Sequence, residues 1–345
     1  MKKIRLIILV VAALVCGTAQ KSAGTDTSHV LPSNGEVLIE PALVAFSNDQ
    51  ALAAPTGQIR VAFYNIEMFT DGMDDDAWRT AELARNQARD AGAIVDELNA
   101  DILLISESEN ERVLAMLNES LARPYAHGFV AAFGSGGARP EKMNIGLLSR
   151  LRPASVDEID FQPLTGEGRP TRGLLRVTYA LDEQHGLLIY ATHLKSNFGK
   201  KQKNYSQRYH AMRLIKEDME RFVAAHPEKA WEKMIIADFN SDPATPRFAD
   251  DPTWQVLTDW RDLWREHPQA ATIHTIPTRY GDAKLQFPPA LFDRVLVHPA
   301  LREAPWTVSL PSVIARGTVT SDVHVKPGQD GHVSDHYPIY VDLVR

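Results

Sequence analysis

Short runs of apolar residues, each bounded by polar clusters, recur along the chain from Arg60 onward. Runs of this length that are rich in Val, Ile and aromatic residues are typical of buried β-strands. The pattern predicts strands at residues 60–66, 101–107, 144–150, 173–181, 186–194, 233–240, 292–299 and 337–344.

Two longer segments have apolar residues at helical spacing. The segment from Trp78 to Asn99 follows an acidic run, which favours a helix N-terminus. The segment from Tyr205 to Ala225 ends shortly before Pro227, as helices often do. Many strands with only three or four helices predict an α+β fold and not an alternating, doubly wound sheet.

The first 19 residues have the features of an export signal peptide: a basic start, an apolar run and small residues at the end. The apolar run from Leu6 to Val15 is short for a bilayer span, so we expect no integral membrane association. Residues 20–57 are predicted to be a leader or linker with weak structure, and residues 58–345 a single domain. We expect a monomer that is periplasmic or secreted.

Composition limits the chemistry further. Cys16, within the signal, is the single cysteine, so the mature protein would have neither disulfides nor thiolate catalysis. The chain has 37 basic and 44 acidic residues, and loss of the three basic residues of the signal would leave a net charge of −10. Any binding of a polyanion must therefore use a local basic patch.

Polar side chains gather at the ends of the predicted strands. Taken singly, an Asp or Asn after a strand is usually turn chemistry, but their joint recurrence is typical of a site built at the edge of a sheet. These residues are Asn65, Glu67, Glu107, His193, Asp238, Asn240, Asp293, Asp335 and His336.

These residue types suit hydrolysis of a phosphate ester. Oxygen ligands from Glu67, Glu107 and Asp335 favour Mg²⁺, with Mn²⁺ or Ca²⁺ as alternatives, over zinc. A magnesium ion held by carboxylates leaves coordination positions for a phosphate oxygen. Two histidines with separate acidic partners would supply a general base and a general acid.

The stretch from His193 to Lys216 is locally basic. It contains seven Lys and Arg residues and no acidic residue, a reversal in an acidic chain. Its aromatic residues Phe198, Tyr205 and Tyr209 would suit stacking on nucleic-acid bases. A solvated basic loop and helix face would have the same composition, so both interpretations stay open here.

Six segments, in order, resemble the motifs of the endonuclease/exonuclease/phosphatase superfamily. The resemblance covers roughly residues 58–345 and is closest to secreted bacterial nucleases among the pancreatic-type deoxyribonuclease-like members. It implies a four-layer αββα sandwich of two packed, mostly antiparallel sheets with outer helices. The segments are YNIE, ADILLISESEN, ATHLKSN, IIADFNSDP, LFDRVLV and VSDHYPI.

The resemblance also implies roles for individual residues. His336 would activate water and be oriented by Asp293, while Asp238 and Asn240 would position the nucleophile and phosphate. His193 would contact the phosphate or assist the leaving oxygen, with Glu141 as its partner. The implied metal site comprises Glu67, Glu107, Asp335 and Asn65, and the implied phosphate and substrate contacts are Lys195, Asn197, Arg172 and Arg208.

Ser106 and Ala237 stand where the family usually has Gln and Gly, and neither departure removes a ligand. The segment 320–325 carries a second Ser-Asp, but a Val separates Asp322 from His324, so we interpret both as loop residues.

Three functions are compatible with this chain. The first is an exported, metal-dependent nuclease acting on DNA or RNA, and the second is a secreted phosphatase or a phospholipase- or sphingomyelinase-type phosphodiesterase. The third is a binding module that keeps the fold without activity, which the complete residue set disfavours.

The adjacency of Asp335 and His336 makes a structural prediction. Neighbours on a regular strand point to opposite faces, so both can reach one site only if the backbone is irregular. Pro338 restricts the residue before it to extended conformations. We therefore expect irregular backbone at residues 333–337.

Overall fold

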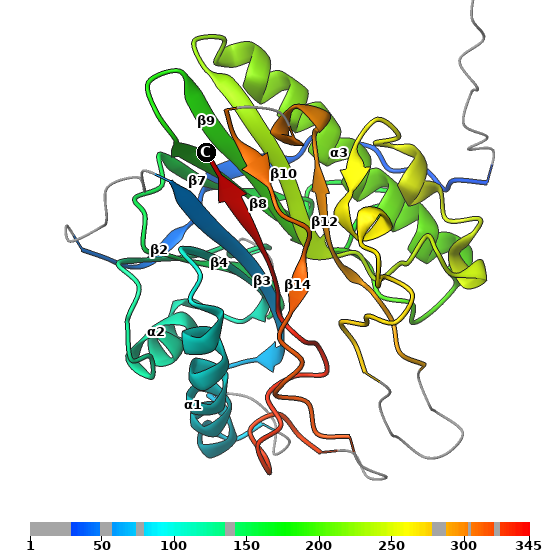
Figure 1. Ribbon diagram of the computed structural model, residues 1–345. Helices are drawn as coiled ribbons and strands as arrows, with labels where there is room; N and C mark the ends of the chain where they lie inside the picture. Colours follow the sequence, from blue (N-terminus) through cyan, green and yellow to red (C-terminus); the bar gives the residue numbers. More distant parts are fainter. Residues whose placement is uncertain are drawn as a thin grey trace, which may run out of the picture.

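The computed structural model describes residues 29–48, 57–73, 79–134, 142–277, 288–302, 305–320 and 325–345. The predicted signal peptide, Glu141, Asp322 and His324 lie outside these residues. Two β-sheets pack face to face, and the helices of the described residues cover their outer faces (Figure 1). The predicted four-layer sandwich is confirmed.

The first sheet has the strand order β1-β7-β8-β9-β10-β12-β11. Only β9 and β10 pair in parallel, and the other neighbours are antiparallel. The long helix α3 (Lys201–Ala225) packs on its outer face through Ala211, Met212 and Ile215. The strands are β1 (Leu38–Pro41), β7 (Ser155–Asp160), β8 (Leu174–Ala180), β9 (His185–His193), β10 (Ala230–Asp238), β12 (Asp293–Val297) and β11 (Arg261–Asp262).

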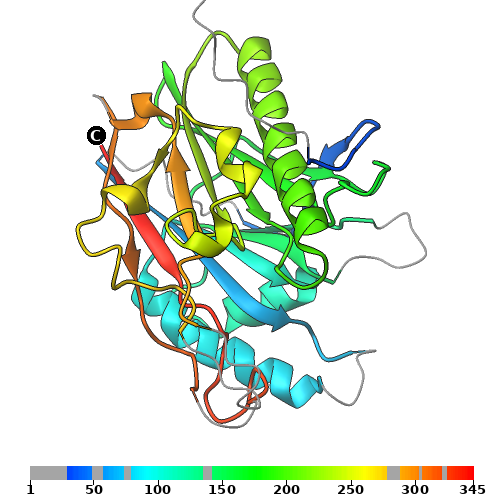
Figure 2. The same cartoon turned by 90° about the vertical axis from the view of Figure 1, so that its right-hand side faces the viewer.

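The second sheet has the order β13-β15-β3-β4-β6-β5-β2, and β14 (Ser312–Val313) also pairs with β15. Here only β3 and β4 are parallel. Helices α1 (Ala81–Leu98) and α2 (Glu111–Glu119) cover its outer face, opposite α3 (Figure 2). The strands are β13 (Thr307–Val308), β15 (Ile339–Val344), β3 (Gln58–Phe69), β4 (Ile102–Ser108), β6 (Asn144–Ser149), β5 (His127–Val130) and β2 (Leu43–Ser47).

Four short 3₁₀-helices complete the secondary structure of the described residues. They follow β10, flank β11 and follow β12. Their bounds are η1 (Pro246–Phe248), η2 (Pro252–Gln255), η3 (Leu263–Glu266) and η4 (Pro299–Arg302).

Strand β3 shows why the central strands have continuous apolar runs. Val61 and Phe63 face the core between the two sheets, whereas Ala62 and Tyr64 face the helices α1 and α2. A strand covered on both faces has no solvent side and therefore no polar alternation. The same reason applies to the other central strands that the sequence predicts.

The N-terminal segment corrects one prediction. Residues 29–48 are not weakly structured: β1 extends the first sheet beside β7, and β2 extends the second sheet beside β5. Ala42, between the two strands, reaches the core. Both strands are edge strands with mostly exposed side chains, so they lack the periodic burial that marks a strand in sequence.

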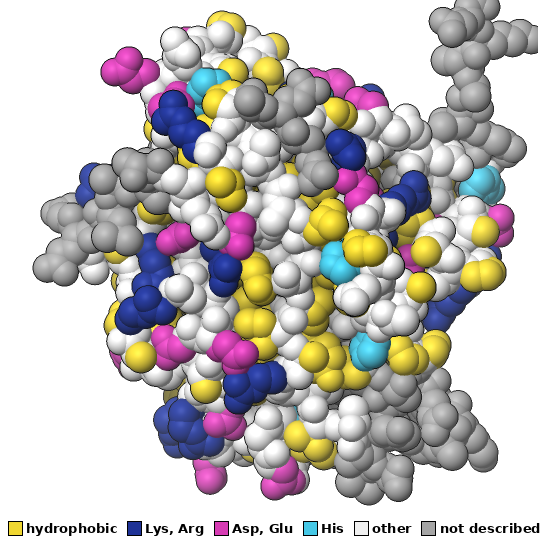
Figure 3. All heavy atoms as spheres, in the orientation of Figure 1, with side chains coloured by type: hydrophobic (Ala, Val, Ile, Leu, Met, Phe, Trp, Pro, Cys, Tyr) yellow, Lys and Arg dark blue, Asp and Glu magenta, His cyan; other side chains and the backbone are white. Residues whose placement is uncertain are grey.

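Charges of both signs are interspersed over the described part of the face in Figure 3. That face has no broad area of basic side chains, as expected for a chain of formal net charge −7.

Candidate active site at the ends of the two sheets

Three predicted site residues lie side by side on neighbouring strands of the first sheet. Asp238, at the end of β10, pairs in register with His193 at the end of β9 and with Asp293 at the start of β12. The parallel pairing of β9 with β10 and the antiparallel pairing of β10 with β12 bring these ends together. Strand topology thus explains why His193 and Asp238 lie at the ends of their strands while Asp293 lies at the start of its strand.

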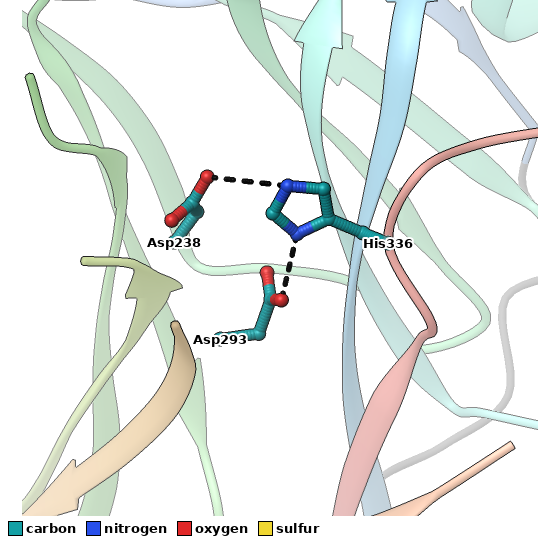
Figure 4. Close-up of side chains that lie close together, drawn as sticks. All are labelled: Asp238, Asp293 and His336. Atoms are coloured by element: carbon teal, nitrogen blue, oxygen red, sulfur yellow. Dashed lines mark hydrogen bonds and ion pairs between the residues drawn. The ribbon is translucent and has the colours of Figure 1, made fainter. Parts of the chain in front are cut away.

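The segment before the last strand supplies the fourth residue of this group. β15 begins only at Ile339, and residues 332–338 contain no regular strand, so the predicted irregular backbone is confirmed. His336 Nδ1 lies 2.7 Å from Asp293 Oδ2, and Nε2 lies 3.7 Å from Asp238 Oδ2 (Figure 4). Asp293 thereby holds the ring with Nε2 facing Asp238.

The two histidines of the site differ in their electrostatic surroundings. Burial opposes protonation of His336, but the carboxylates of Asp293, Asp335 and Asp238 outweigh it and hold the pKa of His336 well above its ordinary value. Burial lowers the pKa of His193 well below its ordinary value, and the positive charge of Arg172 lowers it further. His193 is therefore neutral near pH 7, with Nε2 3.4 Å from Asp238 Oδ2.

Asp238 is the centre of the hydrogen-bond network. Its Oδ1 accepts from Asn240 N at 2.8 Å, and its Oδ2 accepts from Asn240 Nδ2 at 3.1 Å and from Asn65 Nδ2 at 3.2 Å. Burial raises the pKa of Asp238, the charge of His336 lowers it, and the neighbouring Asp293 raises it. Together these effects raise the pKa of Asp238 above its ordinary value.

The second sheet contributes Asn65 and Glu107 through irregular strand ends. The pairing of β3 with β4 shifts register after Asn65, and Met68 and Glu107 have positive φ angles of 45° and 64°. Glu107 Oε2 accepts from Met68 N at 2.8 Å, and Asn65 Nδ2 lies 3.3 Å from Glu107 Oε1. Non-glycine residues with positive φ are uncommon, and a bulge re-aims side chains toward a site.

Glu67 has a partner that the sequence does not reveal. His332 Nδ1 accepts from Val319 N at 3.1 Å, so its proton is on Nε2, which donates to Glu67 Oε2 at 3.1 Å. His332 is 2% exposed and fixes the direction of the Glu67 carboxylate. The two residues are 265 positions apart, and no local pattern links them.

Ser334 and Gln87 attach the last loop to β3. Ser334 Oγ donates to Asn65 O at 2.6 Å and accepts from His336 N at 3.0 Å. Gln87 Nε2 donates to both Glu67 O and Val333 O. In the sequence, Ser334 belongs to the VSDHYPI motif, whereas Gln87 is a polar residue on the buried face of α1.

The carboxylates of the second sheet fit a divalent cation. Burial raises the pKa of Glu107, and the negative charges of Asp335 and Glu67 raise it further. Asn65 Oδ1 is buried and, among the described residues, has no hydrogen-bond partner. Mutually repelling carboxylates beside a spare amide oxygen are the donor set that Mg²⁺ or Ca²⁺ prefers.

A second group of ligand atoms lies beside the first. One ligand atom from each of Asp238, Asp293 and His336 falls within 4.8 Å of the others, so this cluster could also hold a metal ion. A metal there would have to replace the 2.7 Å contact between His336 and Asp293. Among the described residues, the predicted ligands Glu67, Glu107 and Asp335 do not form a group with this separation, so their role as the metal site stays a prediction.

Arg172 is the predicted phosphate contact with unused donors. Its Nη2 donates to Met143 Sδ, while Nε and Nη1 are buried and lack a partner among the described residues. Its charge lowers the pKa of both His193 and Glu107, which places it at the site. His193 Nδ1 has no hydrogen-bond partner in the described part of the chain but lies 3.8 Å from Glu107 Oε1, and the predicted partner Glu141 stays a prediction.

Lys195 and Asn197 contact residues of their own loop and its supports, and their predicted role as substrate contacts stays a prediction. Lys195 Nζ donates to Ser196 and to Phe198 O within its own loop. Asn197 donates to Asn240 O and accepts from Arg208 Nη1, so both ends of its amide are used. These side chains build and support the loop 194–199.

Arg208 corrects the prediction most clearly. Its side chain is 0% exposed, and Nε and Nη2 donate to Asp251 Oδ2 at 3.0 and 2.7 Å. Its Nη1 donates to Lys195 O at 2.8 Å. Because a guanidinium enclosed in this way cannot reach solvent or a substrate, Arg208 is a buried structural residue.

Replacing Arg208 by alanine is expected to reduce the free energy of unfolding by about 3–5 kcal/mol, because Asp251 is left buried without its cation. Arg213→Ala on the same helix is the matched control: it removes an exposed pair with Glu217 and should cost about 0.3–0.5 kcal/mol. Urea unfolding of the two variants measures the difference. Equal losses would contradict a stabilising role for the buried pair.

The aromatic residues of the basic stretch are also not equivalent. Tyr205 is 4% exposed and donates to Arg247 O, so it is unavailable for stacking on a base. Tyr209 is half-buried beside His210. Phe198, by contrast, is 72% exposed.

An αββα sandwich with acidic, amide and imidazole side chains at one end of its sheets defines a class of phosphoesterases. The model of the Endonuclease/Exonuclease/phosphatase family matches residues 62–336, and the chain belongs to this family. Members hydrolyse phosphoester bonds, usually with divalent metals. No curated protein matches the chain.

Solved structures share the fold at low sequence identity. Truncated TDP2 from Caenorhabditis elegans is 19% identical, with 84% of this chain and 98% of that chain covered and a TM-score of 0.54. SmcL is 16% identical, with 84% and 100% covered and a TM-score of 0.59. TDP2 from D. rerio, complexed with a single-strand DNA product, is 14% identical, with 83% and 98% covered and a TM-score of 0.52.

In the described part of the chain, every helix is too short or too polar to cross a bilayer.

Proposed function

We propose that the protein is an exported, divalent-metal-dependent phosphodiesterase that hydrolyses DNA or RNA with a water activated by His336. One observation carries the proposal. The chain brings the His336–Asp293 pair, Asp238 and His193 together with the carboxylates of the second sheet. These groups supply a base, phosphate-orienting groups and ligands for a cation.

Each residue of the site has a separate role in the proposed reaction. In its neutral form, His336 takes a proton at Nε2 from the attacking water. The water oxygen forms a new bond to phosphorus as the bond to the leaving oxygen breaks, and the leaving oxygen takes up a proton from solvent. Asp293 holds the ring and stabilises the imidazolium. Asn240, Asp238 and neutral His193 orient the water and the phosphate, and Arg172 offers its unused donors to a phosphate oxygen.

Glu67, Glu107, Asp335 and Asn65 would hold the cation. When bound, it would neutralise negative charge on the phosphate and its leaving oxygen. His332 orients Glu67, and the outer partners of metal-binding residues affect affinity by about 10–100-fold.

Nucleic acid is the favoured substrate because of the basic residues that follow His193. Lys200, Lys201 and Lys203 are exposed at the start of α3. A polynucleotide extends several phosphates beyond the scissile bond and can contact them, whereas a small phosphate ester cannot. One structural neighbour, TDP2 from D. rerio, was captured with a single-strand DNA product.

A substrate panel tests this proposal. We expect the purified protein to cleave DNA or RNA with Mg²⁺ or Mn²⁺, to stop in EDTA, and to recover when metal is added back. Release of phosphorylcholine from choline phospholipids, or of free phosphate from monoesters, with both nucleic acids left intact, would replace the proposal with the lipid or phosphatase alternative.

A further inference from the structure

Phe198 is an exposed aromatic residue in the loop that follows His193. It is 72% exposed, and among the described residues it is the single aromatic in the set of exposed large hydrophobic side chains. It follows Asn197 directly, and Asn197 Nδ2 donates to Asn240 O at 2.8 Å. Consecutive Cα atoms are about 3.8 Å apart, so the backbone of Phe198 lies one residue from the side chain that contacts Asn240.

The backbone under this ring is held firmly. Phe198 O accepts from Lys195 Nζ at 3.1 Å and from Asn204 Nδ2 at 3.1 Å. Buried Arg208 anchors the start of the same loop through Lys195 O. Gly199 then turns the chain into α3 with a φ of 101°, which a residue with a side chain rarely adopts. A fixed loop presents the ring at little entropic cost on binding.

The residues that follow Phe198 in the chain are basic. Lys200 and Lys203 are exposed, and Lys201 is 3.5 Å from the exposed carboxylate of Asp250. A planar apolar face beside ammonium groups matches a nucleotide, whose base stacks while its phosphate is neutralised. The neighbouring aromatic Tyr205 is buried and cannot share this role.

We propose that Phe198 is a stacking platform for an unpaired base next to the scissile phosphate, so that the protein prefers single-stranded nucleic acid over duplex. This inference rests on the proposed nuclease function. A base within a duplex is already stacked on its neighbours and must be pulled out at a cost, whereas a base in a single strand is available to the ring.

An anionic membrane is the other surface that could bind an aromatic ring among lysines. Interfacial binding scales with buried apolar area, and one ring contributes little of it. The position of Phe198 beside Asn197 and Asn240 instead suits a contact within the substrate of the site. Membrane binding is therefore an outcome of the test below.

The test compares Phe198→Ala, Phe198→Leu and Phe198→Trp with the wild type. The substrates are a single-stranded oligonucleotide, its duplex and the small diester bis(4-nitrophenyl) phosphate. We expect kcat/KM on the single strand to fall between about 5-fold and about 100-fold in the Ala and Leu variants, from the usual worth of one stacked base. Trp should retain activity, and the small diester should be cleaved equally by all four proteins.

The controls separate the possible failures. Leu keeps the apolar bulk without a planar face, so wild-type activity of Phe198→Leu would overturn stacking. Unchanged single-strand cleavage in every variant would overturn the inference and leave the nuclease proposal standing. A wild type that cleaves neither oligonucleotide would overturn both. If Phe198→Ala lost binding to phosphatidylserine vesicles while its oligonucleotide cleavage stayed intact, the ring would contact a membrane surface and not a base, and the inference would be overturned.

Discussion

Replacing His336 by asparagine is expected to lower the rate of phosphodiester hydrolysis by about 10²–10⁴-fold, the usual contribution of a general base. The asparagine amide can still donate to Asp293 in place of His336 Nδ1, which lies 2.7 Å from Asp293 Oδ2. It has no equivalent of Nε2, which faces Asp238. The substitution therefore removes the base and keeps the buried Asp293 partnered.

Steady-state kinetics and urea unfolding together measure this effect. His298→Ala is the matched control, because His298 follows β12 at the end opposite Asp293 and its ring lies against Trp260. We expect the control to keep wild-type activity. A His336→Asn protein that is as stable as the wild type and within tenfold of its rate would contradict the assignment of the base.

Replacing Glu107 by glutamine is expected to weaken metal binding strongly. The substitution keeps the size of the side chain and an acceptor for Met68 N, but it removes a negative charge from the group that Asp335 and Glu67 complete. Since loss of an outer partner already costs about 10–100-fold in metal affinity, loss of a carboxylate ligand should cost at least as much. The Mn²⁺ concentration for half-maximal activity should rise accordingly.

Glu109→Gln is the control for Glu107→Gln. Glu109 follows Glu107 by two residues, just after the end of β4, where it pairs with Lys142 and accepts from Asp71 N. Titration of EDTA-treated protein with Mn²⁺ gives the half-saturating concentration for each variant. If Glu107→Gln matches the control while Asp238→Asn shifts the titration, the ion is held by Asp238, Asp293 and His336.

The strands of the sandwich were predictable because burial on both faces leaves a continuous apolar run. β3 and β9 illustrate this, since their solvent-free positions give uninterrupted apolar segments that end at Asn65 and His193. β1, β2 and α2 were not predicted, because exposed edge strands and a short helix produce weak periodicity. The short strands β5 and β7 were also not predicted.

The site was predictable as far as it depends on residue type and strand ends. His336 and Asp293 lie together as the family resemblance implies. The role of Arg208 was not predictable. A basic helix face has the same sequence whether its arginine is solvated or is paired with a buried acid 43 positions away. His332 was missed for a similar reason, since its contact with Glu67 exists only in the folded chain.

Tyr205 shows the same limit for aromatic residues. Its place in a basic stretch resembles that of Phe198, yet the helix turns Tyr205 inward against Arg247 while the preceding loop leaves Phe198 outward. Sequence composition shows which residue types a segment contains. The direction in which each side chain points depends on its position around the helix and on the conformation of the loop.

The most direct test of metal-dependent phosphodiester hydrolysis at this site is relaxation of supercoiled plasmid DNA by the purified protein. We predict nicking with Mg²⁺ or Mn²⁺, none in EDTA, recovery on metal add-back, and loss of nicking in His336→Asn at equal protein concentration. Nicking that persists in EDTA, or that His336→Asn performs as well as the wild type, would contradict the account.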